Sequence, residues 1–492
     1  MILANGISKV RGIFFKKLFE LTYATKVQGK KRKTWIPLNV KYYLSKRLVT
    51  LELCEQGKGS RMKRKIISIF IVCLVALFPQ CLSGGLADSS THSGAQPTDW
   101  WSMFHHDLSH EGYSTSKAPL TNQTLWNYTT GGFVNDPVVV DGVLFIGSYD
   151  YKVYALNITD GSLLWTYATG GYVDTSPTVV NGIVFVNSND NKTYALNATN
   201  GAIIWNYTTG RRLDSSPAVS GGVVFVGSAD HNIYALNSIN GVLIWNYTAS
   251  GGVMLSSPAV TNNILFIGAG RRLYALNATD GALIWNFTIQ RPVESSPAIF
   301  GGTVFVGSLD QNVYAINAST GALVWNYTTG GYVESGPCIY DGTVFAGSAD
   351  HNVYALNAKS GSLTWKYKTG DIVASSPVVA EGVVFVGSLD NKIYALNAKN
   401  GALIWSYTTG GVVVSSPAIV DGVVYLGSWD HKVYAFGSVS NSRLSTNSNL
   451  LVPALIIGFI AVCSCILLVF LIKRKRRGKL TDSIFGKIKK VK

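Results

Sequence analysis

The sequence predicts an all-β protein: an eight-bladed β-propeller of four-stranded blades, in which an N-terminal strand closes the last blade, plus one C-terminal transmembrane helix. Three observations predict the ring. A unit of about 40 residues recurs eight times, each unit divides into four short β-type runs, and the first and last units are complementary fragments. An apolar run near the C-terminus predicts the helix.

The repeat is marked by residues of three kinds. Each unit has a proline after a small or polar residue (Pro137 to Pro417) and a tyrosine in a Tyr-Ala pair (Tyr154 to Tyr434). Each unit also has one tryptophan: Trp126, Trp165, Trp205, Trp245, Trp285, Trp325, Trp365 and Trp405. A fixed period of this length indicates a solenoid, an array or a propeller.

Each unit divides into four short strands. In the unit that ends near Trp405, the β-type runs are 378–380, 383–386, 393–396 and 403–407. β-branched and aromatic side chains dominate these runs, and Gly, Asn and Asp separate them, which is typical of strands joined by tight turns. The units show no helical periodicity.

The two ends of the array favour a ring over an open rod. The first unit begins with only its tryptophan strand, around Trp126, and the last unit ends at Phe436 without that strand. The first strand can therefore complete the last blade, and the closed ring avoids an exposed sheet edge. We expect one domain over residues 122–437.

The segments outside the ring predict a membrane protein. Residues 62–87 have a basic start, a short apolar run and a small-residue end, which is typical of a secretory signal peptide; an uncleaved signal anchor is the alternative. Residues 450–472 are an uncharged apolar run long enough to span a bilayer, and the basic tail, 473–492, marks the cytoplasmic side. We expect a single-pass cell-membrane protein with the propeller outside.

The remaining segments are connectors or extensions. Residues 88–121 precede the ring, and residues 438–449 link it to the predicted span. Residues 1–61 form a basic leader upstream of the signal peptide. Because signal peptides begin near the start of a chain, we interpret this leader as a mis-called start, with translation beginning at Met62.

The charge distribution argues against a nucleic-acid partner. The full chain has 42 Lys and Arg against 27 Asp and Glu, a formal net charge of +15. Residues 88–440, however, hold 14 basic and 23 acidic residues, a net charge of −9, so the basic excess lies in the two ends. A mildly acidic folded domain has no electrostatic attraction to nucleic acid.

The tryptophan strand and the turn before it resemble a known repeat. Residues 195–205 read Ala-Leu-Asn-Ala-Thr-Asn-Gly-Ala-Ile-Ile-Trp. This run resembles the tryptophan-docking motif of the pyrroloquinoline-quinone (PQQ) type propeller repeats. The segment from Trp101 to Ser114 resembles the one before the ring in membrane-anchored, outer-membrane-assembly-factor-like bacterial and archaeal proteins. The resemblance implies that each tryptophan docks against the next blade. It implies no single function, since the fold hosts dehydrogenases, scaffolds and surface binding proteins.

The residues expected of a quinoprotein dehydrogenase are missing from the sequence. That resemblance implies PQQ above a vicinal Cys-Cys disulfide, calcium on carboxylate and amide ligands, and an Asp as base. The chain has no adjacent cysteine pair, and Cys338 is the one cysteine of the predicted ectodomain. We expect no catalytic residue, metal ligand or cofactor, PQQ and calcium included. The recurring Gly-Ser-x-Asp turns lack EF-hand spacing, so we expect each Asp to cap its own turn.

Positions that vary from unit to unit predict a binding face. The turn after Gly-Ser and the turn before Ser-Pro are expected on the same face of the ring. They contain the candidate residues Tyr149, Tyr172, Asp174, Arg211, Arg212, Asp214, Arg271, Arg272, Arg291, Glu294, Tyr332, Glu334 and Trp429. Arginine and aromatic side chains beside carboxylates favour contact with an extracytoplasmic protein or glycan. Solvated turn residues without a partner are the alternative.

Eleven Asn-x-Ser/Thr sequons occur, and five of them lie on the tryptophan strands, where alternation predicts solvent exposure: Asn127, Asn206, Asn246, Asn286 and Asn326. We expect partial glycosylation; sequons arising by repetition of an Asn- and Thr-rich unit are the alternative. The sequence thus predicts a non-catalytic binding or scaffold propeller at the cell membrane. A PQQ-dependent dehydrogenase-like redox protein and a structural or adhesive cell-surface glycoprotein are the two alternative functions.

Overall fold

The computed structural model describes residues 40–45, 48–53 and 99–437. The chain divides into two units, Met1–Ala95 and Gln96–Lys492. In the first, β1 (Val40–Ser45) and β2 (Leu48–Leu53) form an antiparallel hairpin. The predicted signal peptide, linker, membrane span and tail lie outside the described residues, and within those residues no helix is long and apolar enough to cross a bilayer.

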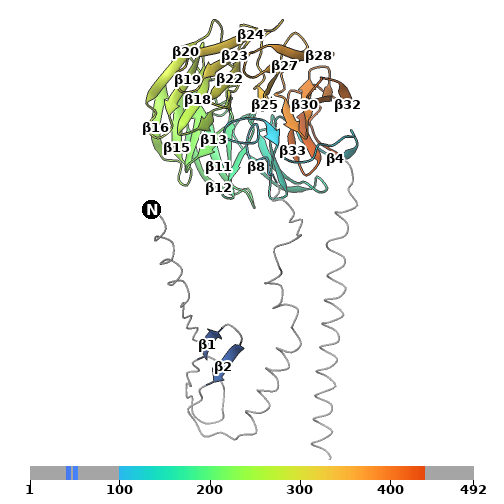
Figure 1. The fold of residues 1–492 in the computed structure, drawn as a ribbon. Helices are drawn as coiled ribbons and strands as arrows, with labels where there is room; N and C mark the ends of the chain where they lie inside the picture. The colour runs from blue at the N-terminus through green and yellow to red at the C-terminus, as the bar shows by residue number, and fades with distance from the viewer. Residues whose placement is uncertain (1–39, 46–47, 54–98, 438–492) are drawn as a thin grey trace, which may run out of the picture. The chain divides into compact units, whose positions relative to one another are not determined.

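Eight sheets follow one another around a ring (Figure 1), which confirms the predicted all-β, eight-bladed propeller with four-stranded blades. Blades 1 to 4 consist of β5 (Val138–Val140), β6 (Val143–Ser148), β7 (Lys152–Asn157) and β8 (Leu163–Ala168); β9 (Thr178–Val180), β10 (Ile183–Ser188), β11 (Lys192–Asn197) and β12 (Ile203–Thr208); β13 (Ala218–Ser220), β14 (Val223–Gly227), β15 (Asn232–Asn237) and β16 (Leu243–Thr248); β17 (Ala259–Thr261), β18 (Ile264–Ala269), β19 (Arg272–Asn277) and β20 (Leu283–Thr288).

Blades 5 to 8 continue in the same order, from the inner strand to the outer strand. They consist of β21 (Ala298–Phe300), β22 (Thr303–Gly307), β23 (Asn312–Asn317) and β24 (Leu323–Thr328); β25 (Cys338–Tyr340), β26 (Thr343–Gly347), β27 (Asn352–Asn357) and β28 (Leu363–Lys368); β29 (Val378–Ala380), β30 (Val383–Ser388), β31 (Lys392–Asn397) and β32 (Leu403–Thr408); β33 (Ala418–Val420), β34 (Val423–Ser428), β35 (Lys432–Gly437) and β4 (Thr124–Thr129).

The burial pattern explains why the sequence alternates only in the outer strands. The two middle strands of each blade are covered on both faces by neighbouring blades, so they read as continuous apolar runs such as 224–226 in β14. In the outer strand β16, Trp245 is buried, whereas Ile244 and Asn246 on either side of it are exposed. One buried side chain per outer strand is therefore enough to hold each blade against the next.

The tryptophans make equivalent contacts between blades. The indole Nε1 of Trp245 donates a hydrogen bond to the Ala278 carbonyl of blade 4 at 3.1 Å, and its ring lies against Gly281. Six other tryptophans donate in the same way to the following blade, at 2.8–3.0 Å. Trp405 instead donates to the Pro119 carbonyl at 3.0 Å, in the segment that leads into the closing strand.

The ring is closed by the strand nearest the N-terminus of the propeller. β4 pairs antiparallel with β35, with Trp126 opposite Ala435, so the complementary end fragments form one blade. Blade 7 departs from the four-strand rule, because β3 (Tyr113–Ser114) adds to β29 as a fifth, parallel strand. This strand was not predicted, since two residues carry no recognisable β pattern.

The segment before the ring, residues 99–121, lies across the inner strands. Its carbonyl groups accept backbone hydrogen bonds from the middle residues of the inner strands of blades 1, 2, 4, 5, 6 and 7, at 2.7–2.9 Å. The side chains of Trp101, Phe104, His105 and His110 are buried there. The segment also contacts the turn that ends an inner strand, where the Ala118 amide donates to Glu381 at 3.1 Å. One side of the ring centre is therefore covered.

Candidate binding face

The segment before the ring contacts a turn that follows an inner strand. The face of the ring where the inner strands begin is here called the open face, and it carries the varying turns. The amide of Tyr149 donates to the carbonyl of Phe133 at 2.9 Å, and the amide of Asn189 donates to that of Tyr172 at 2.9 Å. In each pair, a turn after Gly-Ser is bonded to a turn before an inner strand. The two classes of turn that the sequence singled out therefore lie together.

The aspartates of the Gly-Ser-x-Asp turns are used inside the scaffold. Asp230 Oδ1 accepts the amide of Asn232 at 2.9 Å, and its Oδ2 accepts both the Tyr234 hydroxyl and the Gly210 amide at 2.7 Å. These bonds join two turns of neighbouring blades, which explains why the residue recurs. Among the residues that the structure describes, no group of three His, Cys, Asp or Glu side chains is placed to hold a metal ion.

Blade 4 breaks this rule, and a pocket lies over the break. Its β18–β19 hairpin pairs Ala269 with Arg272 across two residues, whereas blade 2 pairs Ser188 with Lys192 across three. Gly270, with φ of 55°, stands in this shortened turn close to Gly251. A pocket of about 710 Å³ lies in the open face, and Gly270 of this shortened turn is one of its lining residues.

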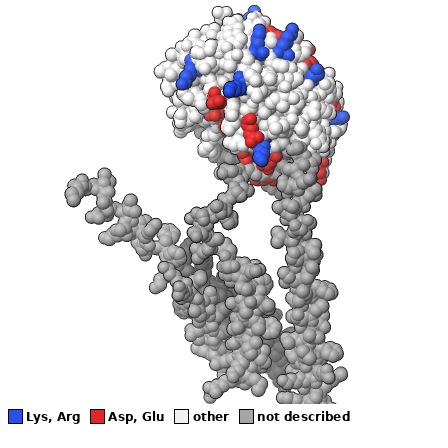
Figure 2. All heavy atoms as spheres, turned by 45° about the vertical axis from the view of Figure 1, so that its right-hand side comes forward, with Lys and Arg blue, Asp and Glu red and all other residues white. Residues whose placement is uncertain are grey.

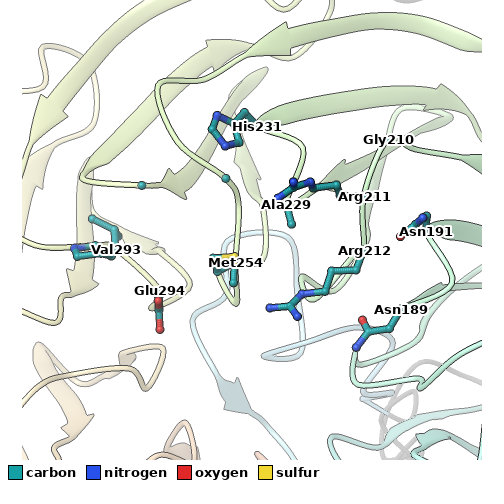
Figure 3. Close-up of a pocket in the computed structure, with 13 residues that line it drawn as sticks. Asn189, Asn191, Gly210, Arg211, Arg212, Ala229, His231, Met254, Val293 and Glu294 are labelled. Atoms are coloured by element: carbon teal, nitrogen blue, oxygen red, sulfur yellow. The ribbon is translucent and has the colours of Figure 1, made fainter.

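The pocket combines basic, acidic and apolar groups (Figure 3). It is lined by Asn189, Asn191, Gly210, Arg211, Arg212, Ala229, His231, Gly252, Met254, Gly270, Pro292, Val293 and Glu294. Arg212 Nε donates to Asp214 Oδ2 at 2.8 Å, and the side-chain amide nitrogen of Asn189 donates to Asp214 Oδ1 at 2.9 Å. Burial raises the pKa of Glu294 above its usual value. The pocket therefore presents arginine on one side and a carboxyl group on the other.

A continuous group of aromatic rings, here called the aromatic shelf, lies beside this pocket and is formed by Phe133, Tyr149, Tyr151, Tyr172, Trp429 and His431. The rings of Phe133 and Trp429 are stacked with centroids 4.9 Å apart. Tyr149 lies 5.7 Å from Phe133 and 4.9 Å from Tyr172, which lies 5.1 Å from Tyr151. The shelf thus spans blades 8, 1 and 2, and ring closure brings Trp429 and His431 of blade 8 against Phe133.

Two carboxyl groups lie next to the shelf, towards the ring axis. Burial raises the pKa of Asp174 to about 6, although it accepts hydrogen bonds from Tyr149 and Asn135. Burial also raises the pKa of Asp136 to about 7, against the hydrogen bond that it accepts from the Ser416 amide. A carboxyl group with such a pKa is readily protonated and can then donate a hydrogen bond.

The structure divides the predicted candidates between these two places. Tyr149, Tyr172 and Trp429 belong to the shelf, with Asp174 beside it. Arg211, Arg212 and Glu294 line the pocket, and Asp214 holds Arg212. The remaining five line neither: Arg271 and Arg272 lie in the blade 4 hairpin, Arg291 in the turn before blade 5, and Tyr332 and Glu334 in the turn before blade 6.

Sequence reasoning missed several members of both places, namely Phe133, Tyr151 and His431 of the shelf, and His231 and Met254 of the pocket. Phe133 occupies the repeat position of Tyr172, so alignment of the units could have found it. His231 and His431 each follow the turn Asp of their unit, in separate blades, and one unit gives no sign that they face a shared surface. Their neighbours across the face could not be read from one unit.

Comparison with known proteins agrees with this architecture. The model of the family described as "Outer membrane protein assembly factor BamB" matches residues 110–271, 269–376 and 368–444. The chain belongs to this family of PQQ-type propellers. No curated protein matches it. Cys338, the one cysteine within 99–437, is buried beside Gly112, so these residues supply no vicinal cysteine pair for a quinone.

Several solved structures are similar to the propeller. The computationally designed protein Ika8 is 17% identical, with a TM-score of 0.59, and the match covers 64% of this chain and 100% of that chain. BamB from Moraxella catarrhalis is 18% identical, with a TM-score of 0.56, covering 64% and 99%. Quinohemoprotein alcohol dehydrogenase from Comamonas testosteroni is 15% identical, with a TM-score of 0.60, covering 71% and 82%. At these identities the likeness shows the fold alone.

Proposed function

We propose that this chain is a non-catalytic extracytoplasmic binding or scaffold propeller, anchored in the cell membrane by its C-terminal segment, which contacts a protein or glycan through the open face. The observation that carries this proposal is that the positions that vary between units gather on the open face. The docking tryptophans and turn aspartates recur around the ring, whereas the open-face positions form a shelf in one sector and a pocket in the next. The family description, an assembly factor, also favours protein contact.

The charge pattern favours a partner of mixed character. Figure 2 shows basic and acidic side chains interspersed on a largely uncharged surface of the propeller. In the pocket, the guanidinium of Arg212 is paired with Asp214, and the carboxyl group of Glu294 stands on the other side. Such a surface suits hydrogen bonds and apolar contacts better than long-range attraction to a polyanion, so nucleic acid is not a proposed partner.

The binding proposal is tested by crosslinking the full-length protein on intact cells and identifying the attached molecules by mass spectrometry. We expect the triple variant Arg211→Ala, Arg271→Ala, Trp429→Ala to give a yield of specific crosslinks at least tenfold lower than that of the unaltered protein. The matched control is Lys359→Ala with Lys399→Ala, because these exposed lysines lie in turns before tryptophan strands, away from the open face. Equal crosslinking by the triple variant and the control would refute the open-face assignment.

The non-catalytic part of the proposal has a separate test. The full-length protein in detergent is incubated with PQQ and Ca²⁺ and then assayed for dye reduction with alcohol and aldose substrates. We expect neither tight PQQ binding nor turnover, because the chain lacks the adjacent cysteine pair of the quinoprotein dehydrogenases. Stoichiometric PQQ binding with dye reduction would establish the dehydrogenase alternative instead.

The second candidate function, a structural or adhesive surface glycoprotein, is favoured by the exposed sequons. Asn127, Asn206, Asn246, Asn286 and Asn326 are all exposed on outer strands. By contrast, Asn197 and Asn277 use their side-chain oxygens to cap turns, in hydrogen bonds to the amides of Thr199 and Thr279. We expect glycans on the outer strands first, and intact-mass analysis of protein from its native cells tests this. An unmodified mass would remove the glycoprotein candidate.

A further inference from the structure

The aromatic shelf is an addition to the scaffold and does not stabilise it in the way that the tryptophan contacts do. The repeat position held by Phe133 and Tyr172 is Arg212 in the turn before blade 3, Gly252 before blade 4 and Pro292 before blade 5. In these blades the inner strand, which follows this turn, pairs with the next strand in the same register. The propeller therefore folds around any of these side chains, and the gathering of rings in one sector needs another explanation.

Much of the ring surface of the shelf faces solvent. The exposed fraction is 36% for Trp429, 43% for Tyr172 and 44% for Tyr151. Exposed aromatic rings that touch one another are costly to hydrate, and contiguous surfaces of this kind mark binding sites. The shelf is also firmly supported, because Phe133 is stacked on Trp429 and the backbones of both are bonded to neighbouring turns. Little side-chain entropy is therefore lost when a ligand is bound.

Polar groups with spare hydrogen-bonding capacity lie at the inner edge of the shelf. The Asn135 amide donates to the Asp174 carboxyl group, which also bonds the Tyr149 hydroxyl. Asn135 Oδ1 is buried and accepts no hydrogen bond from the residues that the structure describes. A buried acceptor without a donor carries a free-energy cost that a ligand donor can remove.

We propose that the aromatic shelf is a saccharide-binding site, in which sugar rings stack on Trp429 and Tyr172 while their hydroxyl groups bond Asn135 and Asp174. This inference rests on the proposed function, since it names the ligand class of the open face. The polarised C–H groups on one face of a sugar ring suit the negative face of an aromatic ring. Sugar hydroxyls both donate and accept, as the orphan amide oxygen and the neighbouring carboxyl group require.

A folded protein partner fits this site less well than a saccharide. A stable protein interface needs about 800 Å² on each partner and a well-packed apolar centre. Here the exposed rings are flanked by a polar edge on one side and by the arginine pocket on the other. The unpaired acceptor, Asn135 Oδ1, is buried, which favours a small donor such as a hydroxyl group over a flat protein surface.

The test uses the full-length protein in a sugar-free zwitterionic detergent, because glucoside and maltoside detergents would compete for the site. Cellohexaose, chitohexaose and hexagalacturonate are titrated in turn, followed by tryptophan fluorescence and by calorimetry. We expect saturable binding of at least one probe. Trp429→Ala and Tyr172→Ala should each weaken the affinity at least tenfold, because each removes a ring on which a sugar stacks. A tenfold loss of affinity is about 1.4 kcal/mol of binding free energy. Thermal unfolding checks that each variant is folded.

Tyr332→Ala is the matched control. Tyr332 has the same repeat position as Tyr172 and a similar exposed fraction, 39%, but no aromatic ring contact within the described part of the chain. It should leave the affinity within twofold. Binding that survives both shelf variants, or that Tyr332→Ala weakens equally, would overturn the shelf assignment. If no probe binds while Trp429-dependent crosslinks to a protein persist on cells, the saccharide inference fails and the proposed function stands; loss of both removes both.

Discussion

The residue immediately before the proline of each inner strand, a serine in six of the eight blades, takes part in a belt of hydrogen bonds around the ring axis. The backbone amide of this residue in one blade donates to the hydroxyl oxygen of its equivalent in the next, as from Ser216 to Ser257 at 3.0 Å. The bond recurs between other neighbouring blades at 2.8–3.3 Å. The belt is interrupted at Gly336, beside which His105 packs. In blade 1 an aspartate, Asp136, takes the place of serine.

Asp136 makes the stability of the ring depend on pH. Its pKa rises from 3.8 to about 7 in the folded protein, mainly because of burial. The folded state therefore keeps a proton that the unfolded chain has released, and stability falls as pH rises from about 4 to 7. We expect Asp136→Ser to relieve this loss, by a few kcal/mol at pH 8 and by almost nothing at pH 4. Thermal unfolding at both pH values measures the difference.

The matched control for this change is Asp280→Ser. Asp280 is an exposed turn residue, and Ser360 stands at its repeat position in blade 6. Its replacement removes one carboxyl group without touching the belt, so the melting temperature should shift little at either pH. If Asp136→Ser and Asp280→Ser shift the melting temperature equally at pH 4 and pH 8, Asp136 does not carry the pH dependence.

At the scale of the element, the contact between an outer strand and the next blade depends on one glycine. Gly281 has φ of 74°, and a Cβ atom there would lie 2.6 Å from Trp245. Gly302 has nearly the same φ, 76°, but a Cβ atom there would meet nothing within 4 Å. The two positions therefore separate the cost of the left-handed backbone from the cost of displacing the tryptophan.

We expect Gly302→Ala to lower stability by about 1 kcal/mol and Gly281→Ala by clearly more, because the added methyl group pushes Trp245 off its carbonyl partner. Denaturant unfolding of both variants measures the two values. Near-ultraviolet circular dichroism should change for Gly281→Ala alone. Equal destabilisation by the two changes would mean that the tryptophan contact adapts to the methyl group at no cost.

The elements differ in how far the sequence could predict them. Outer strands were predictable because Trp245 is buried between exposed neighbours, which gives a clear alternation. The turn aspartates were predictable as caps because Asp230 bonds its own turn. The shelf was not, since Phe133 and Trp429 are almost 300 residues apart and meet only after closure. The pocket includes Gly270 of the turn that is one residue shorter, and this deletion was visible in the sequence as irregularity near Arg271 but not as a hollow.

At the scale of the whole propeller, closure and filling of the ring were predictable to different degrees. The missing strand at one end and the extra strand at the other end were complementary in sequence, so the pairing of β4 with β35 could be predicted. The course of residues 99–121 could not. This segment has no repeat, and its partners are backbone groups of six blades, whose identity leaves no mark in the sequence.

In blade 8, no turn joins the outer strand to the strand next to it, because β4 comes from the other end of the domain than β35. The described residues of the other blades hold all four propeller strands in one continuous segment. Trp126 and Trp245 are equally buried and make the same indole hydrogen bond, to Ile158 and to Ala278. Truncation of either to alanine should cost about 3–5 kcal/mol. Only Trp126→Ala also frees β4 to detach, which exposes the edge of β35 to pairing with another chain.

We therefore expect the two variants to have similar melting temperatures at low protein concentration but different association behaviour. On warming towards the transition, Trp126→Ala should form larger species in a concentration-dependent way, because strand exchange through β35 and β4 joins one ring to the next. Trp245→Ala, whose blade keeps all four strands in one continuous segment, should not. Light scattering after size-exclusion chromatography, at several concentrations, measures this. Association by Trp245→Ala to the same extent would show that the closing strand is no weaker than the covalent blades.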